Sequence, residues 1–288
     1  MNTWQSEVPP PPEVAPGWVG WLRVVIKAVP LAIVVFGGLA VLLILRLVER
    51  PIFGLRRPAT PFVTQGVCRT ALVIVGLRLS VEGPRCSGGP IVANHVSWLD
   101  IFVLNAARRV YFVSKSEVAG WLGIGWLARA TGTVFIERDR RLAAAQRDLL
   151  MERVRIGHLL ALFPEGTSTD GKRILPFKST LFDAFLNGEG AESIQPVTLA
   201  YHATDGEDDR FYGWWGDMEF GAHLIKVLAA PRGGRVEAVF HEPMVTNEFA
   251  SRKALAKAAE EVVREGLARR LPQPIAAEST SRAAAGSS

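Results

Sequence analysis

The chain has 288 residues, 49% of them apolar, and a formal net charge of +5. This length allows one large domain or two small ones with a sizeable core. Two cysteines exclude a disulfide framework, and the five scattered histidines form no zinc motif. The basic residues lack a nucleic-acid-binding module or an aromatic platform, so we expect no nucleic acid, no metal ion and no resident cofactor.

The amino-terminal region predicts a membrane-associated segment. Residues 1–17 are rich in proline and polar side chains, which is typical of a disordered arm. Residues 28–45 carry no charge. As a helix they would extend about 27 Å, close to the ~30 Å hydrocarbon core of a bilayer. Trp18 and Trp21 precede them, as in an interfacial aromatic belt, and no signal-peptide cleavage site follows.

The charges on either side of this segment indicate its orientation. Two basic residues precede it and four arginines follow, Arg46, Arg50, Arg56 and Arg57. The positive-inside rule therefore favours an inner (cytoplasmic) membrane location with the active site on the cytoplasmic side. A second apolar stretch, 62–77, is interrupted by Arg69 and predicts an amphipathic or re-entrant helix at the interface, or alternatively a core helix of the next domain. We expect membrane-associated helices over 18–78.

The rest of the chain alternates between strand and helix patterns. Short β-branched and apolar runs predict strands over 79–81, 91–93, 110–113, 134–136, 158–163, 193–200 and 236–240. Longer runs predict helices over 98–106, 120–130, 140–156, 180–186 and 248–271. This alternation indicates an α/β domain over 79–272, with a mixed, largely parallel sheet flanked by helices. Residues 273–288 are expected to form a disordered tail.

The most informative motif follows the strand predicted at 91–93. His95 falls in the turn after that strand, where open α/β folds bind their ligands, and Asp100 falls in the first turn of the next helix. An imidazole held by a carboxylate is the general-base half of a Ser-His-Asp system, and the missing serine indicates that a substrate supplies the hydroxyl. The alternative is a capping box of Ser97 and Asp100, with His95 as an ordinary loop residue.

Two further turns carry candidate binding residues. Residues 132–141 end a strand in a group of arginines that includes Arg138, and guanidinium groups bind phosphate well. A solvated helix start with internal ion pairs is the alternative. Residues 163–168 form a sharp turn in which Gly166 allows a ligand or the backbone to approach closely, although a plain strand-to-helix turn has the same pattern.

Together these turns resemble the sequence blocks of glycerolipid acyltransferases. Asn94 to Asp100, Asn-His-Val-Ser-Trp-Leu-Asp, resembles the His-x4-Asp block of that family. Gly132 to Arg138 looks like the second block, Phe163 to Thr167 like the third, and Gln195-Pro196-Val197 like the fourth. The resemblance covers roughly residues 60–245 and is greatest to the 1-acylglycerol-3-phosphate O-acyltransferases.

The resemblance implies a reaction, its partners and its site residues. His95 would deprotonate the hydroxyl of a lysolipid acceptor, Asp100 would orient the ring, and the acceptor oxygen would attack an acyl thioester of coenzyme A or acyl carrier protein. Membrane lipids are the surrounding partners. Lys115 and Arg138 look like the basic groups that hold the acceptor phosphate. The implied substrate-binding set is Asn94, Ser97, Lys115, Gly132, Arg138, Phe163, Pro164, Glu165, Gly166 and Thr167.

One position departs from the family pattern. The third block commonly has an arginine after Glu-Gly-Thr, whereas this chain has Ser168, which cannot replace a bidentate guanidinium. Basic residues downstream could compensate, namely Lys172, Arg173 or Lys178. The main prediction is acylation of 1-acyl-sn-glycerol-3-phosphate to phosphatidic acid in phospholipid biosynthesis. The alternative is acylation of lyso-ornithine lipid, whose headgroup carries a carboxylate, because Thr-Ser-Thr-Asp-Gly resembles that branch of the family.

Two hypotheses from other classes remain open at this point. An acyl thioesterase would use His95 to activate water and would release free fatty acid without a lysolipid. A non-catalytic lipid-binding protein would keep its role when His95 is replaced by alanine. Both differ from an acyltransferase in a measurable product.

Overall fold

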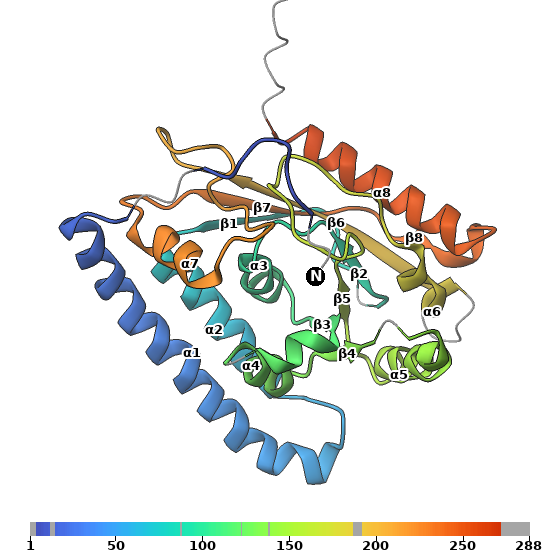
Figure 1. Ribbon diagram of the computed structural model, residues 1–288. Helices are drawn as coiled ribbons and strands as arrows, with labels where there is room; N and C mark the ends of the chain where they lie inside the picture. The colour runs from blue at the N-terminus through green and yellow to red at the C-terminus, as the bar shows by residue number, and fades with distance from the viewer. Residues whose placement is uncertain are drawn as a thin grey trace, which may run out of the picture.

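The chain forms one mixed sheet with helices packed on both of its faces (Figure 1). The computed structural model describes residues 4–11, 15–86, 88–121, 123–137, 139–186 and 192–271. Arg138 and the predicted tail over 273–288 lie outside the described residues. The extents predicted for the amino-terminal arm, the membrane-associated helices and the catalytic domain stay predictions.

The sheet has the predicted mixed and largely parallel character. Its strands are β1 (Arg78–Glu82), β2 (Ile91–Ala93), β3 (Tyr111–Lys115), β4 (Val134–Ile136), β5 (Leu160–Leu162), β6 (Ser193–His202), β7 (Arg235–Phe240) and β8 (Met244–Val245). The order across the sheet is β1-β7-β6-β2-β5-β3-β4, with β8 paired to β6. Among the described residues, the pairs that β6 makes with β7 and β8 are antiparallel and all the other strand pairs are parallel. The carboxyl ends of β3, β4, β5 and β2 therefore meet at one edge.

The helices mostly lie where the sequence predicts them. They are α1 (Trp18–Phe53), α2 (Thr60–Val75), α3 (Leu99–Ala107), α4 (Ile124–Thr131), α5 (Ala143–Arg155), α6 (Asp183–Leu186), α7 (Phe220–Ala229) and α8 (Arg252–Ala268). Short 3-10 turns occur at Ser116–Gly120, Arg140–Leu142, Ser179–Phe182 and Thr246–Glu248. Helix α7, which has ten residues, was not predicted. Helix α8 starts later than predicted because Ser251 caps it, accepting a hydrogen bond from the Ala254 N–H.

Two apolar clusters cover the two faces of the sheet. Successive residues of a strand point to opposite faces, so Ile91 belongs to one cluster and Val92 to the other. Helices α2, α3 and α7 supply the first cluster, and α5, α6 and α8 supply the second. Strands buried on both faces read as continuous apolar runs, which is why they were predictable from the sequence.

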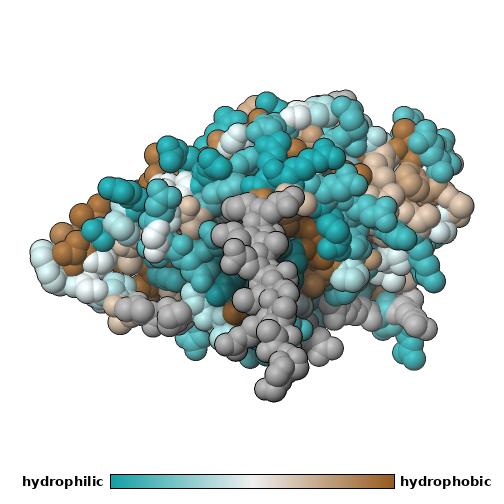
Figure 2. Space-filling view, turned by 90° about the horizontal axis from the view of Figure 1, so that it is seen from above, coloured by the Kyte–Doolittle hydropathy of each residue, from teal (hydrophilic) through white to brown (hydrophobic). Residues whose placement is uncertain are grey.

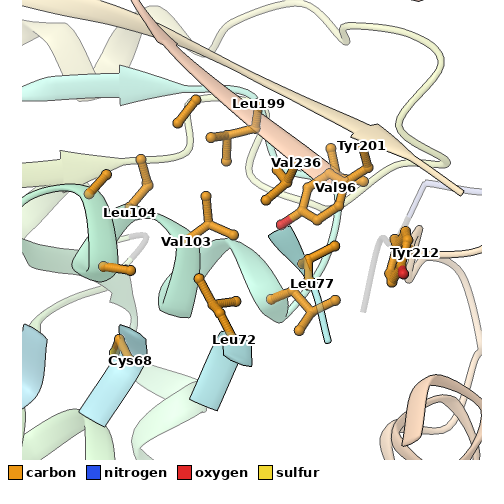
Figure 3. Packing of buried hydrophobic residues seen from close by; sticks show 14 of the residues in the cluster. Cys68, Leu72, Leu77, Val96, Val103, Leu104, Leu199, Tyr201, Tyr212 and Val236 are labelled. Atoms are coloured by element: carbon orange, nitrogen blue, oxygen red, sulfur yellow. The ribbon is translucent and has the colours of Figure 1, made fainter. Parts of the chain in front are cut away.

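Helix α2 belongs to the core on one side and is exposed on the other. Cys68 and Leu72 point from α2 towards Val103 and Leu104 of α3 and are buried there (Figure 3). By contrast, 77% of Val73 is exposed on the outer side of α2. The alternative interpretation as a core helix therefore holds for its inner face, and an interfacial interpretation remains open for its outer face.

Helix α1 is much longer than the segment predicted from hydropathy. Its 36 residues extend about 54 Å, and it is the one helix in the described part of the chain that is long and apolar enough to cross a membrane. Most of its apolar side chains are exposed, and some of them gather at the left edge of the molecule in Figure 2. An exposed apolar surface of this size indicates membrane association.

A buried carboxylate joins the end of α1 to the start of α2. Glu49 is 4% exposed. One of its oxygens accepts the N–H groups of Ala59 (2.6 Å) and Thr60 (3.0 Å), and the other accepts the Thr60 hydroxyl (2.9 Å). A negative charge at a helix amino terminus is favourable, so Glu49 caps α2 from a different helix.

Replacing this cap should loosen the joint between the two helices. We expect Glu49→Ala to lower the free energy of unfolding by about 1–2 kcal/mol, because the N–H groups of Ala59 and of the buried Thr60 lose their acceptor. Thermal unfolding in detergent micelles measures the change, with the exposed Glu117→Ala as control. Equal unfolding midpoints for the two variants would contradict the capping role.

Candidate active site

The predicted motif residues come together at the carboxyl edge of the sheet. The turn of His95 follows β2, the turn of Glu165 follows β5, and Lys115 ends β3. These three strands are adjacent and parallel, so their carboxyl ends lie side by side. The sheet thereby assembles turns that are far apart in the sequence.

His95 and Asp100 form a close pair. The Nδ1 atom of His95 lies 2.7 Å from Oδ2 of Asp100. The same oxygen also accepts the backbone N–H groups of Val96 (2.7 Å) and Ser97 (3.0 Å), so it is an acceptor and His95 Nδ1 carries the proton. In the neutral form of this ring, Nε2 is the nitrogen with a free lone pair. The pairing requires His95 in the turn and Asp100 in the first turn of α3, and both are found there.

The two side chains differ in their access to solvent. The side chain of Asp100 is fully buried, whereas that of His95 is 20% exposed. The ring of Phe163 stacks on the His95 ring at 4.2 Å between centroids and fixes its plane. The pair therefore presents an exposed base supported by a buried acid, which is suited to removing a proton from a hydroxyl.

The capping-box interpretation accounts for only half of these contacts. The Asp100 carboxylate accepts the Ser97 N–H, as a capping acid does. The Ser97 hydroxyl, however, is buried and makes no hydrogen bond within the described part of the chain. The carboxylate also holds His95, which a capping box alone does not require.

Asn94 and Glu165 hold the backbone on either side of His95. The Asn94 side chain donates to the Leu199 carbonyl (2.9 Å) and accepts the Leu199 N–H (2.7 Å) of β6. Glu165 accepts the N–H groups of His95 and Leu175, each at 2.8 Å. Both side chains are at most 2% exposed. The structure thus places them as supports for the turn, whereas the sequence suggested that they bind substrate.

Burial has a strong effect on Glu165. Removal from solvent raises the pKa of its carboxyl to about 8, against the opposing influence of the two N–H donors. The buried Asp100 carboxylate nearby adds to the increase. Glu165 therefore titrates close to neutral pH in the folded protein.

Two lysines lie beside the turn that follows β5. Lys115 donates to the Gly166 carbonyl at 2.7 Å, and the Lys178 ammonium occupies the space that a side chain at Gly166 would need. Gly166 also has a φ of +70°, which favours glycine. The Pro164 carbonyl accepts the backbone N–H of Lys178 at 3.0 Å. The Thr167 hydroxyl accepts the backbone N–H of Trp4 at 3.4 Å. Two ammonium groups are therefore held at the turn next to the pair.

One predicted residue lies elsewhere. Gly132 ends α4 with a φ of +91° and precedes the amino end of β4, so the length of that strand separates it from the edge of His95. Its carbonyl accepts a hydrogen bond from Arg153. The structure therefore does not bring Gly132 together with the pair.

Sequence reasoning missed one contact of the pair entirely. The Tyr201 hydroxyl donates to Oδ1 of Asp100 at 2.7 Å. Tyr201 lies on β6, about a hundred residues along the chain, inside a run of buried strand residues. A single tyrosine in such a run gives no signal in the sequence.

Comparisons with known proteins identify the family of this chain. The acyltransferase family model matches residues 82–200. The lyso-ornithine lipid O-acyltransferase of Rhodobacter capsulatus is 54% identical over 91% of this chain and 96% of its own length. The chain belongs to this acyltransferase family. The class of reaction follows from membership of this family, so the protein is a lysolipid O-acyltransferase.

Other relatives place the acyltransferase more broadly. The 1-acyl-sn-glycerol-3-phosphate acyltransferase of Neisseria meningitidis is 34% identical over 48% of this chain and 54% of its own length. The crystal structure of the 1-acyl-sn-glycerophosphate acyltransferase of Thermotoga maritima has a TM-score of 0.62, with 21% identity over 87% of this chain and 95% of that one. At this identity the likeness shows a shared fold.

The raised pKa of Glu165 leads to a pH-dependent prediction. In the folded enzyme the pKa is about 8, above the ordinary 4.5, so the folded state binds more protons between these values. The contribution of Glu165 to stability is therefore complete at low pH and is lost as the pH rises through about 8. We expect the stability of the wild type relative to Glu165→Gln to fall between about pH 5 and about pH 9.

Thermal unfolding in detergent at several pH values measures this difference. Glutamine does not titrate, and it keeps the shape of the side chain while retaining only one of two acceptors. The exposed Glu137→Gln is the control, and its difference from the wild type should not follow this trend. A constant difference between wild type and Glu165→Gln at all pH values would disprove the buried titration.

Proposed function

We propose that the acyltransferase moves a fatty acyl group from a thioester of acyl carrier protein or coenzyme A to the hydroxyl of a lyso-ornithine lipid. The observation that carries the reaction is the His95–Asp100 pair at 2.7 Å, with Nε2 of His95 available as the base. The acceptor is inferred from the 54% identity to the Rhodobacter capsulatus enzyme over nearly the whole chain. This replaces the main prediction from sequence, 1-acyl-sn-glycerol-3-phosphate, by its alternative.

In this mechanism His95 acts first as a base and then as an acid. Its Nε2 takes the proton of the acceptor hydroxyl while that oxygen attacks the thioester carbonyl. Asp100 stabilises the resulting imidazolium through Nδ1. The tetrahedral intermediate then expels the carrier thiolate, which takes the proton back from Nε2. One C–O bond forms, one C–S bond breaks, and no acyl-enzyme is needed.

The charges beside Ser168 favour a zwitterionic headgroup over a phosphate monoester. Asp170 follows two residues later, is 2% exposed, and pairs with Arg173 at 3.1 Å. The guanidinium that could replace the missing family arginine is thus already neutralised within the chain. A phosphate carrying up to two charges would compete with Asp170 for the Arg173 guanidinium. The carboxylate of an ornithine headgroup carries a single charge and needs less positive charge from the protein.

The environment of the reaction is proposed to be the inner membrane. Helix α1 carries the exposed apolar surface, and its two ends remain attached to the domain. Near its start, Lys27 donates to the Ala230 carbonyl (3.0 Å), and near its end Glu49 caps α2. The arginines that follow the apolar segment favour a cytoplasmic position for the active site.

Substitution of either member of the pair should abolish turnover. We expect His95→Ala and Asp100→Asn each to lower kcat by about 10³–10⁴-fold, because the base or the group that orients it is lost. His202→Ala is the matched control, since His202 also lies next to a carboxylate, Glu237 at 2.8 Å, away from the predicted motifs. Acyl transfer by the purified proteins in detergent is the measurement, and wild-type turnover in His95→Ala would exclude the mechanism.

A panel of acceptors and donors tests the substrate. We expect kcat/KM for lyso-ornithine lipid to exceed that for 1-acyl-sn-glycerol-3-phosphate by at least about tenfold. Each acceptor is paired with labelled acyl carrier protein and coenzyme A thioesters, and one reaction omits the acceptor. A preference for the phosphate acceptor would return the assignment to the main prediction, and free fatty acid without acceptor would indicate a thioesterase.

A further inference from the structure

Tyr201 connects the central sheet to the candidate catalytic pair. It lies on β6, and only 4% of the residue is exposed. Its ring sits between Val96 and Val236 and extends towards the start of α3 (Figure 3). There its hydroxyl donates to Oδ1 of Asp100 at 2.7 Å. The proposed reaction assigns no part to this phenol.

The hydrogen bonds of Asp100 show why one more donor matters. Oδ2 accepts three N–H groups, from the His95 ring and from the backbone of Val96 and Ser97. Oδ1 accepts the Tyr201 hydroxyl, which is its one hydrogen bond to the described residues. A fully buried carboxylate oxygen without a donor is costly, so the phenol decides how the carboxylate is oriented.

Tyr201 can act only as a donor in this position. Burial and the adjacent Asp100 charge raise the pKa of its hydroxyl well above the ordinary value of 10. The titratable groups around the pair are Tyr212, whose ring centroid is 5.8 Å from that of Tyr201, and Glu165, which holds the His95 backbone. Lys115 and Lys178 lie beside the neighbouring turn, at Gly166. Tyr212 bonds elsewhere, since its oxygen accepts the Gly234 N–H at 2.6 Å.

We propose that Tyr201 is a positioning residue for the acyl transfer reaction, acting through Asp100 on the basicity of His95. The inference rests on the proposed role of His95 as the base. By donating to Oδ1, the phenol holds the carboxylate in the plane that aims Oδ2 at Nδ1. It also takes up part of the carboxylate charge, so less of that charge acts on the His95 ring.

Removing the phenol oxygen should therefore change catalysis and its pH dependence together. We expect Tyr201→Phe to lower kcat by about tenfold, because the carboxylate loses one of its fixed donors. With more charge on Asp100, the imidazolium becomes more stable, and the acid limb of kcat/KM should move to higher pH by roughly half to one unit. The ring and its apolar packing are retained.

Tyr212→Phe is the matched control. It also removes one buried hydroxyl and one hydrogen bond in the same aromatic contact, but it does not touch Asp100. We expect both variants to lose comparable thermal stability in detergent, and only Tyr201→Phe to shift the pH profile. An unshifted acid limb in a folded Tyr201→Phe, with kcat lowered no more than in Tyr212→Phe, would reduce Tyr201 to a packing residue.

A second variant keeps the test decisive if Tyr201→Phe does not fold. Tyr201→3-fluorotyrosine keeps the hydrogen bond and makes the phenol a stronger donor, so the acid limb should move to lower pH. A limb that stays in place or moves the other way would overturn the proposal. His95→Ala, measured in the same assay, separates the two levels of inference. If His95→Ala is inactive while both Tyr201 variants keep the wild-type pH profile, the positioning role of Tyr201 is disproved and the proposed function stands. If His95→Ala turns over normally, the proposed function is disproved.

Discussion

The architecture of the site depends on one buried carboxylate. Asp100 is fully enclosed, and an ionised carboxylate without partners in such a place would be strongly unfavourable. Four donors offset this penalty: two from the backbone of the β2–α3 turn, one from His95 and one from Tyr201 on β6. Because they come from two parts of the chain, the turn of residues 95–97 and strand β6, the carboxylate is satisfied only when both are in place. Folding of this region therefore also places the His95 ring in its position next to Asp100.

The parallel sheet extends this constraint to the rest of the turn. Asn94 is tied to the backbone of β6 on one side of β2, and the His95 N–H is tied to Glu165 after β5 on the other. The backbone of His95 is thus clamped between its two neighbouring strands, and its ring is clamped by Asp100 and Phe163. A base held at this many points loses little entropy when a substrate arrives, which is how rigid elements favour catalysis.

The sequence was informative where chemistry and position are local. His95 and Asp100 are five residues apart, the strands are continuous apolar runs, and the mixed sheet followed from their alternation with helices. It was uninformative where a contact depends on strand order, since Tyr201 and Leu199 reach the motif only because β6 lies next to β2. Residue type alone does not reveal these partners: the amide of Asn94 and the carboxyl of Glu165 look like ligand groups, and in the structure each makes hydrogen bonds to the backbone. Gly132 is in the right motif but at the amino end of its strand.

The long apolar helix α1 and the site are parts of the same packed unit. Arg69, which interrupts the second apolar stretch, donates with Gln65 to the Ala106 carbonyl at the end of α3. A cation at the carboxyl end of a helix is favourable, so this charge in an apolar stretch has a structural purpose. Helix α3 is thereby fixed at both ends, by α2 at its carboxyl terminus and by the Asp100 contacts at its amino terminus. Since α1 packs on α2, the exposed apolar surface of α1 connects to His95 through two helix contacts, and the fold itself sets the position of the site relative to that surface.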